Sequence, residues 1–276
     1  MNFLLNFLKG IFVGVANIIP GVSGGTIAVI LGIFDRLISA INSLFSNFKK
    51  SFLFLLPIGL GAVAGILALS RLLGFCLENY SFPTNYFFVG LVAGSVPLIY
   101  GKASHKGVKP GYIASAVIAF AIVVLFTLLK DPGTTVSITE LSLPNAAIFL
   151  GAGAIAAAAM VIPGISGSFV LVLLGLYPSV LKALNTLNIP LLLSLGVGII
   201  LGVLLISKLI SIVMERAYSV TYFAILGLII GSLYSIAADP ATYASGVSAA
   251  SVIVSVVTFA VGFFLALILG RDKPAS

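Results

Sequence analysis

The sequence has 276 residues, of which 61% are hydrophobic and 8% are charged. Soluble globular domains carry roughly a quarter charged residues, so this composition excludes an ordinary water-soluble domain and indicates a surface that lies mostly in lipid. The single cysteine, Cys76, excludes an internal disulfide and a cysteine-based metal site. The net charge of +7 is best explained by the cytoplasmic loops of a membrane protein, which are rich in Lys and Arg. Because no basic patch is interleaved with aromatic residues, we expect no nucleic-acid partner.

In chain order, the apolar segments predict an all-α polytopic membrane protein. Continuous apolar runs of about 20 residues are typical of transmembrane helices, whereas transmembrane β-strands alternate apolar and polar residues. Two regions, 3–45 and 143–185, are apolar but broken in the middle. No positive residue precedes Lys9, and the break recurs in mid-chain, so we do not expect the first region to be a signal peptide. The unbroken candidate spans are 52–79, 82–101, 111–130, 190–215, 219–238 and 248–270.

The two breaks have the same pattern. Proline ends a helix and glycine permits a turn, so we expect each region to be two helical arms that meet at a Pro-Gly-x-Ser-Gly joint. The first joint reads Ile19-Pro20-Gly21-Val22-Ser23-Gly24-Gly25, and the second joint reads Ile162-Pro163-Gly164-Ile165-Ser166-Gly167-Ser168.

The similarity extends beyond the joints. Residues 19–42 align without gaps with 162–185, with ten identities in 24 positions, and residues 56–96 align with 193–233, with thirteen in 41. We therefore predict a single membrane domain, 1–276, made of two repeats, 1–130 and 131–276. Each repeat is expected to be a broken helical hairpin, either re-entrant or fully spanning, followed by three transmembrane helices. Because three crossings move the chain to the opposite face, the repeats are expected to be inverted, as in many secondary transporters.

The loops predict the orientation. Positive loops lie in the cytoplasm, so the more basic side, with both termini, is expected to be cytoplasmic in the cytoplasmic (inner) membrane. The other side would carry little beyond Lys130 and Lys182. The basic side would carry Lys9, Lys49, Lys50, Lys102, Lys106, Lys109, Arg216, Arg271 and Lys273.

The joints are the first candidate site. A helix start leaves free N–H groups with a partial positive charge, and two such starts near the midplane would suit an anion. The alternative is a tight turn that only packs the hairpin. An amide before the first joint, Asn17, could line the site or cap the broken arm. The candidate phosphate-binding residues here are Asn17, Ser23, Gly24, Gly25, Thr26, Ser166, Gly167 and Ser168.

Intramembrane charges are the second candidate. Arg71 and Glu78 lie seven residues apart, and Lys208 and Glu215 occupy the matching positions of the second repeat. A spacing of seven keeps both groups on one helix face, and a charge inside the membrane indicates function. Arg71 and Lys208 could hold a phosphate, and the glutamates could pair with them or take up protons. The alternative is that these side chains reach the interface.

Asp35 and Arg36 have no charged counterparts in the second repeat, where Pro178 and Ser179 occupy the matching positions. They could form a local ion pair of little value, contribute to coupling, or form one wall of an asymmetric site. No Ser-His-Asp pattern, acid pair or metal-ligand cluster is evident, so we expect no metal, no cofactor and no enzymatic reaction.

The two joints with their flanks resemble a bacterial and archaeal membrane family, the polyprenyl-phosphate transporters. The resemblance covers nearly the whole chain. It implies movement of undecaprenyl phosphate, the lipid carrier of cell-envelope (peptidoglycan) synthesis, from the outer to the inner leaflet for reuse. The expected partners are then this lipid and the surrounding membrane lipids.

Two other functions stay open at this point. One is an inverted-repeat transporter or channel for a small inorganic anion, and the other is a membrane enzyme that acts on lipid phosphates. Small-residue faces such as Gly59, Gly61 and Gly65 permit close helix packing, within the chain or between copies in a homo-oligomer.

Overall fold

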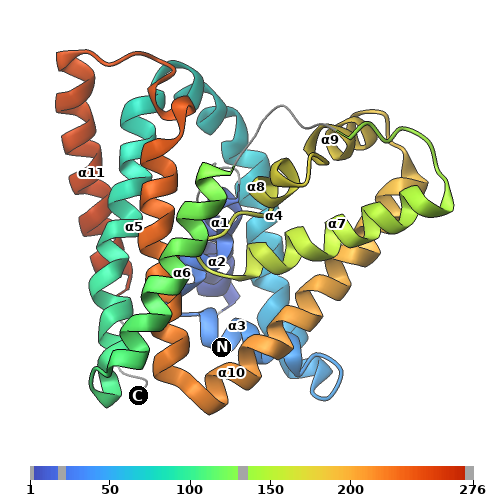
Figure 1. The fold of residues 1–276 in the computed structure, drawn as a ribbon, viewed down its shortest axis with the longest axis horizontal. Helices are drawn as coiled ribbons and strands as arrows, with labels where there is room; N and C mark the ends of the chain where they lie inside the picture. The colour runs from blue at the N-terminus through green and yellow to red at the C-terminus, as the bar shows by residue number, and fades with distance from the viewer. Residues whose placement is uncertain (1–2, 18–22, 130–135, 271–276) are drawn as a thin grey trace.

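The computed structural model describes residues 3–17, 23–129 and 136–270. Within these ranges the chain is helical and has no strand (Figure 1). Six helices are long and apolar enough to cross a membrane, or up to eight if each of two bent helix pairs forms one span. The expected all-α polytopic membrane fold is therefore confirmed.

The predicted unbroken spans are also confirmed, with small shifts at their ends. The spans 190–215 and 219–238 form one long element that is kinked where Ala217 leaves the helical conformation (φ −144°, ψ 51°). The helices are α1 (Phe3–Ala16), α2 (Gly24–Ile30), α3 (Phe34–Asn42), α4 (Phe48–Asn79), α5 (Ser81–Ala103), η1 (Ser104–Lys106), α6 (Pro110–Leu128), α7 (Leu143–Val161), α8 (Gly167–Leu173), α9 (Tyr177–Asn185), α10 (Ile189–Ala238), η2 (Pro240–Tyr243) and α11 (Ala249–Leu269).

The broken regions differ from the expected pair of arms. In each region the arm that follows the joint is divided again, so that α2 and α3 meet at 118° and α8 and α9 at 114°. The second bend lies at Gly32 (φ 66°) and Gly175 (φ 68°), in the left-handed region that glycine adopts without steric cost. Because these glycines occupy matching positions, the arm that follows the joint bends at the same place in both hairpins.

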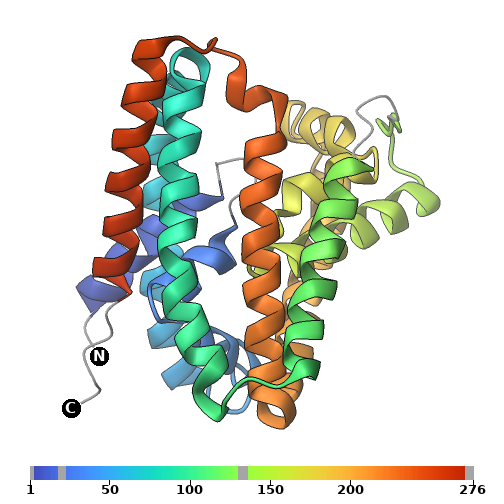
Figure 2. The same cartoon turned by 60° about the vertical axis from the view of Figure 1, so that its left-hand side comes forward.

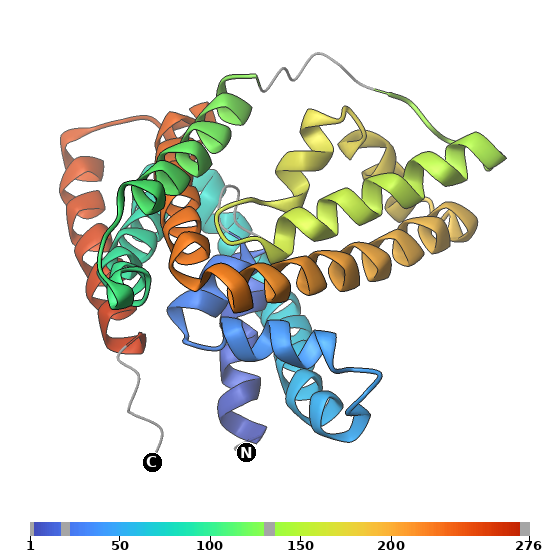
Figure 3. The same cartoon turned by 60° about the horizontal axis from the view of Figure 1, so that its bottom comes forward.

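Close helix packing joins α1 to α4 and α7 to the first part of α10, residues 189–216. A Cβ atom on Gly61 would overlap the backbone oxygen of Phe7, and one on Gly198 would overlap that of Leu150. Gly61 and Gly198 are matching positions of the two repeats. The same kind of contact therefore holds the hairpin to the next helix in both repeats, and Figure 3 shows α7 running beside α10.

The remaining long helices pair across the two repeats. Gly90 of α5 contacts the backbone of Phe259 in α11, and its matching residue Gly227 of α10 contacts that of Ala116 in α6. Figure 2 shows these pairs side by side, with α5 next to α11 and the second part of α10 next to α6. The repeats therefore interlock in one body. The inverted relation between them stays a prediction that this matched packing supports.

Candidate functional site

The two joints meet inside the protein. The backbone N–H of Gly164, in the second joint, donates hydrogen bonds to the hydroxyl oxygens of Thr26 (2.8 Å) and Ser23 (3.2 Å). Both hydroxyl side chains are buried, with 1% of each residue exposed. The expectation that the hairpins bring their joints together is therefore met for these described residues.

The polar groups of the first joint are largely engaged within the protein. The Asn17 side-chain oxygen accepts from the backbone N–H of Gly24 (3.0 Å), and the Ser23 hydroxyl accepts from that of Thr26 (3.2 Å). A Cβ atom on Gly25 would lie 2.6 Å from the backbone oxygen of Val161, so glycine permits the close approach of the two joints. Residues 18–22, which complete this joint, lie outside the described ranges.

The second joint is more open. The hydroxyl groups of Ser166 and Ser168 lie 2.8 Å apart, and Ser168 is exposed. Ser168 also lines a cavity of about 260 Å³, whereas Ser23 and Thr26 do not. Gly167 is buried against the backbone of Ala156. The described residues of the two joints are thus unequal in this conformation, because Ser168 of the second joint lines the cavity and Ser23, Gly24 and Gly25 of the first joint do not.

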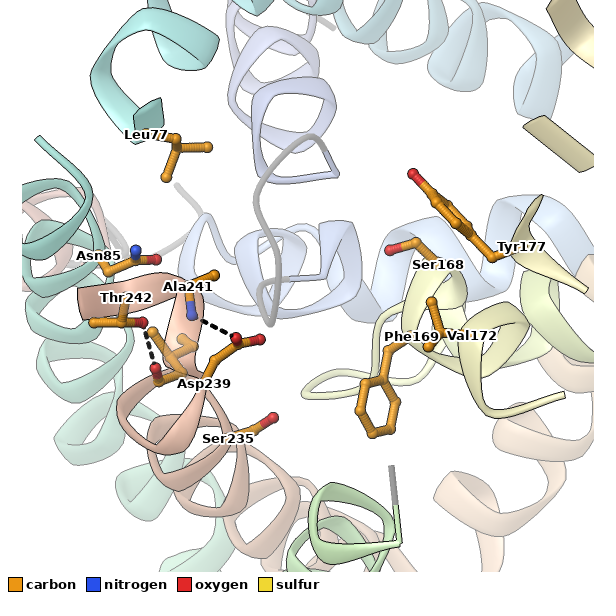
Figure 4. Close-up of a pocket in the computed structure, with 11 residues that line it drawn as sticks. Leu77, Asn85, Ser168, Phe169, Val172, Tyr177, Ser235, Asp239, Ala241 and Thr242 are labelled. Carbon is orange, nitrogen blue, oxygen red and sulfur yellow. Dashed lines mark hydrogen bonds between the residues drawn. The ribbon is translucent and has the colours of Figure 1, made fainter. Parts of the chain in front are cut away.

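That cavity, called the polar cavity below, lies between the second hairpin and the ends of α4, α5 and α10. Its polar lining consists of hydroxyl groups, one amide and one carboxylate, and none of the described lining residues is Lys or Arg. Figure 4 shows the two opposing walls. Asn85, Ser235, Asp239 and Thr242 form one wall, and Ser168 and Tyr177 form the other.

Asp239 is not among the candidate residues that the sequence pattern predicts. Its carboxylate accepts a hydrogen bond from the backbone N–H of Ala241 (3.0 Å) at the start of η2, and it also lines the polar cavity. A capping aspartate is common, which is why the sequence pattern does not mark it as functional. Within the described ranges, no three His, Cys, Asp or Glu side chains are grouped as a metal site would require.

A second cavity, of about 250 Å³, has a purely apolar lining and is called the apolar cavity below. It lies between two tightly packed helix pairs, α1 with α4 and α5 with α11, and α2 contributes to its wall. Its lining includes Phe12, Ile27, Leu69, Leu73, Leu91 and Leu265.

The two cavities share the facing sides of α4 and α5. On α4, Leu69 and Leu73 line the apolar cavity and Leu77 lines the polar cavity. Residues spaced by four lie on one face of a helix. On α5, Asn85 lines the polar cavity, and Phe88, one turn further, lines the apolar cavity. A polar site is therefore followed along the same two helices by an apolar one.

The predicted intramembrane charges are not brought to these cavities. Arg71 and Glu78 on α4 and Lys208 and Glu215 on α10 are all exposed, and none lines the polar or the apolar cavity. The Glu215 carboxylate accepts a hydrogen bond from Ser211. Phosphate binding by Arg71 and Lys208, and coupling by the glutamates, therefore remain predictions that this conformation does not support.

Asp35 and Arg36 contact different partners and do not form the local ion pair that the sequence suggested. Arg36 lies over the ring of Phe54, 4.6 Å from its centroid. Asp35 accepts a hydrogen bond from the hydroxyl of Tyr222, and its carboxylate lies 3.8 Å from the Lys102 ammonium group. The sequence pattern selected Asp35 but neither of these two partners, and a role of Asp35 in a site remains a prediction.

Comparison with known proteins identifies the family. Residues 13–254 match the model of a family described as VCA0040-like, undecaprenyl phosphate translocase-like. The chain belongs to this family. A polyprenyl-phosphate transporter of Staphylococcus aureus is 34% identical over 279 aligned positions, covering 97% of this chain and 96% of the relative.

A polyprenyl-phosphate transporter of Vibrio cholerae is 34% identical over 249 positions, covering 84% of this chain and 77% of the relative. No solved structure matches the chain. The resemblance seen in the sequence is thus confirmed at the level of the family. As a member of this translocase-like family the chain is a multi-pass membrane transporter, and the polar and apolar cavities described above can be interpreted in that light.

Proposed function

We propose that this protein moves undecaprenyl phosphate across the cytoplasmic membrane, from the outer to the inner leaflet, so that the lipid carrier is reused in cell-envelope synthesis. The relatives are named polyprenyl-phosphate transporters. The observation that carries the proposal is the placement of the polar and apolar cavities along the same faces of α4 and α5.

This placement suits a lipid with a charged head and one long tail. The head would occupy the polar cavity, where Ser168, Tyr177 and Ser235 supply hydroxyl groups. The tail would follow Leu77, Leu73 and Leu69 into the apolar cavity. Pockets that enclose a drug-sized ligand measure roughly 300–1,000 Å³, so 250 Å³ would hold only the part of the tail nearest the head, and the remainder would stay in lipid.

A small inorganic anion would not use the apolar cavity. The described residues of its lining offer no hydrogen-bond donor side chain, and an anion gains nothing from apolar surroundings. A membrane enzyme acting on lipid phosphates would need groups that activate a nucleophile or protonate a leaving group. The polar cavity contains one carboxylate and no histidine among its described lining residues. Both alternatives are therefore less well supported than lipid movement.

The proposed orientation places the polar cavity at the outer face. The cavity lies at the end of the molecule where α4 ends and α5 begins. The opposite end carries the exposed Lys49, Lys50, Lys106 and Lys109, and positive residues favour the cytoplasm. The described ends of α1 and α11 lie at that same end (Figure 1). Under this proposal both termini are cytoplasmic and the structure is outward-facing.

The proposed mechanism is alternating access. Rocking of the repeats about the joints would expose the head to one face and then the other, with the contact between Thr26 and Gly164 at the centre. Movement of fluorescently labelled or radiolabelled undecaprenyl phosphate between the leaflets of liposomes containing the purified protein tests this function. Saturable movement that inorganic phosphate barely inhibits is the expected result.

Other outcomes of the same assay would contradict the proposal. Uptake of inorganic phosphate with no lipid movement would establish a small-anion transporter. Release of inorganic phosphate from the lipid would establish an enzyme. Empty liposomes and liposomes with an unrelated membrane protein control for spontaneous movement of the lipid.

A further inference from the structure

The residues of the polar cavity have counterparts in the other repeat. The gapless alignment of 56–96 with 193–233 matches Asn85 with Tyr222, and continued in the same register it matches Asp239 with Lys102. The alignment of the hairpins matches Tyr177 with Phe34. If the repeats are equivalent, these counterparts should form a second site at the opposite face of the membrane.

The counterparts do gather at one place. The Tyr222 hydroxyl donates a hydrogen bond to Asp35, next to Phe34, and the Lys102 ammonium group lies 3.8 Å from the same carboxylate. The Lys102 nitrogen also lies 5.6 Å from the centroid of the Tyr222 ring. Asp35, Lys102 and Tyr222 are called the Asp35 cluster below. It joins α3 and α5 of the first repeat to α10 of the second.

The Asp35 cluster and the polar cavity lie toward opposite ends of α5. Asn85 and Lys102 are separated by 17 residues of this helix, or about 25 Å at 1.5 Å per residue. Under the proposed orientation the polar cavity therefore faces outward, and the Asp35 cluster faces the cytoplasm.

Side chains fill the space at the Asp35 cluster, whereas the equivalent space at the outer face is the open polar cavity. Tyr222 is 0% exposed and Phe34 is 1% exposed, whereas Tyr177, the counterpart of Phe34, is 38% exposed and borders the polar cavity. Ile99 is buried in the same hydrophobic cluster as Phe34 and Tyr222. A transporter that opens to one face at a time requires this kind of inequality between equivalent positions.

We propose that the Asp35 cluster is a second, cytoplasm-facing site for the phosphate head, closed in this conformation, in which Lys102 binds the phosphate. This inference rests on the proposed function and on the equivalence of the repeats. In the closed site the Asp35 carboxylate occupies the position beside Lys102 that the phosphate takes when the site opens.

The charges of the two positions support a phosphate ligand. Lys102 stands where the outer site has the acidic Asp239, so the cytoplasmic site has a cation, whereas the described lining of the polar cavity has none. The ion pair between Lys102 and Asp35 is partly exposed, at 32% and 41% of the side chains, and such pairs contribute little stability. A phosphate monoester carries more negative charge than a carboxylate and can replace Asp35, which shifts the population toward the open state.

A plain structural role is the competing interpretation, in which Asp35 and Tyr222 only fasten α3 to α10. Thiol labelling separates the two interpretations. In a Cys76→Ser background, Ser235→Cys reports on the polar cavity and Leu98→Cys, its counterpart in the aligned sequence, reports on the cytoplasmic position. We expect a membrane-impermeant maleimide to label Ser235→Cys from the outer face in intact cells, and to label Leu98→Cys slowly in inverted vesicles.

Substitution Asp35→Asn should reverse this pattern. We expect faster labelling of Leu98→Cys and slower labelling of Ser235→Cys, because the substitution weakens the hydrogen bond from the buried Tyr222 hydroxyl as well as the ion pair with Lys102, and both contacts hold the closed state. Lys106→Gln, which changes an exposed neighbour outside the cluster, should change neither rate. Unchanged rates in Asp35→Asn, or a rise at both reporters, would contradict the inference. If Asp35→Asn does not fold, Tyr222→Phe provides the same comparison with loss of only one hydroxyl group.

The phosphate is tested in the Asp35→Asn background with farnesyl monophosphate as the probe in detergent. We expect Asp35→Asn/Lys102→Gln to bind it about tenfold more weakly than Asp35→Asn/Lys106→Gln, as the loss of one charge-assisted hydrogen bond predicts. Binding of inorganic phosphate and of uncharged farnesol is measured separately, so that the contribution of the phosphate head is distinguished from that of the prenyl tail. Lys102 would be excluded as the phosphate ligand if the two double variants bound farnesyl monophosphate with equal affinity. It would also be excluded if Lys102→Gln weakened the binding of farnesol as much as the binding of farnesyl monophosphate.

The two proposals can fail separately. The labelling experiment needs no substrate, so reciprocal labelling without lipid movement in liposomes would overturn the proposed substrate and leave the two-site arrangement standing. Normal lipid movement with unchanged labelling in Asp35→Asn would retain the proposed function and overturn the cytoplasmic site.

Discussion

The backbone N–H of Gly164 donates a 2.8 Å hydrogen bond to the hydroxyl of Thr26, 138 residues earlier in the chain. The donor belongs to the second joint, and the acceptor lies in the first turn of α2, directly after the first joint. Among the described residues, the hydroxyl groups of Ser23 and Thr26 are the acceptors for the Gly164 N–H, and a membrane interior offers no water to replace them. The broken backbone of the second joint therefore depends on side chains of the first hairpin for this hydrogen bond.

Thr26→Val should destabilise the protein because the Gly164 N–H would lose its shorter hydrogen bond in a buried position. An unsatisfied buried donor lowers the free energy of unfolding by about 1–3 kcal/mol, and the remaining bond to Ser23 at 3.2 Å places the expected loss in the lower part of that range. Thermal unfolding in detergent, followed by circular dichroism, measures the effect.

Two controls accompany this variant. Thr26→Ser retains the hydroxyl and should unfold near the wild-type temperature. Thr127→Val removes a hydroxyl that bonds only to the backbone of its own helix, at Val123. If Thr26→Val and Thr127→Val unfold at the same temperature, the contact between the joints contributes no more than an ordinary helix-surface hydroxyl.

Gly61→Ala should destabilise the protein, and Gly59→Ala should not. A Cβ atom at Gly61 would overlap the backbone of Phe7, whereas nothing lies within 4 Å of one at Gly59. Overpacking lowers stability by about 1–3 kcal/mol, while removing an unopposed helical glycine raises it by about 0.5–1 kcal/mol. The unfolding temperature in detergent should therefore fall for the first variant and rise or stay constant for the second.

The second repeat provides an independent copy of this experiment. Gly198→Ala should act like Gly61→Ala, and Gly196→Ala like Gly59→Ala, since a Cβ atom would overlap Leu150 in the first case and meet nothing in the second. Different responses in the two repeats would contradict equivalent packing.

Sequence periodicity and composition predicted most of the helices, because a run of apolar residues long enough to span a membrane has few alternatives. The kink at Ala217 was predicted as a boundary between two spans, since Glu215 and Arg216 interrupt the apolar run. The second bend of each hairpin was missed. Gly32 and Gly175 were visible as an aligned pair, but a lone glycine in an apolar helix does not by itself predict a left-handed residue.

The site was predicted less completely than the fold. Ser168 could be selected because its joint is a local motif. Asn85, Tyr177 and Asp239 could not, because each lies on a different element and only the folded chain brings them around one cavity. Charge inside an apolar run marked Arg71 and Lys208, yet that signal gives no information on which way a side chain faces, and both are exposed.

Arg71→Gln and Lys208→Gln should leave the affinity for the phosphate head almost unchanged in the outward-facing state, because neither residue lines the polar cavity. A charge-assisted bond to phosphate would contribute about 1.5–3 kcal/mol, so its loss would weaken binding by about tenfold or more. Binding of farnesyl monophosphate to purified variants measures the difference. A loss of that size, with normal expression, would require a conformation in which the side chain reaches the head.

Asp239→Asn should strengthen binding of the phosphate head in the polar cavity, because it removes the one negative charge from the described lining and like charges repel. Asparagine can still accept the hydrogen bond from the Ala241 N–H that caps η2. Glu78→Gln removes an exposed carboxylate outside the cavity and is the matched control. Weaker binding in Asp239→Asn would instead indicate that the carboxylate brings a cation into the site with the phosphate.

Leu73→Trp should fill part of the apolar cavity and slow the movement of a long-chain prenyl phosphate, with little effect on a short-chain one. Leu67→Trp, on the same helix but 74% exposed, should leave both rates unchanged. The natural chain contains no tryptophan, so each variant carries a single fluorophore. Uncharged polyprenol in the detergent micelle should shift the emission of the Leu73→Trp variant and not that of Leu67→Trp.

This comparison tests where the tail lies without depending on transport. Equal emission shifts in the two variants would mean that polyprenol covers α4 as ordinary lipid does. A shift confined to Leu73→Trp, together with slower movement of the long chain only, would place the tail in the apolar cavity. Leu73 and Leu77 share one face of α4, and Leu77 borders the polar cavity. A tail beside Leu73 would therefore place the head beyond Leu77, on the side of the polar cavity.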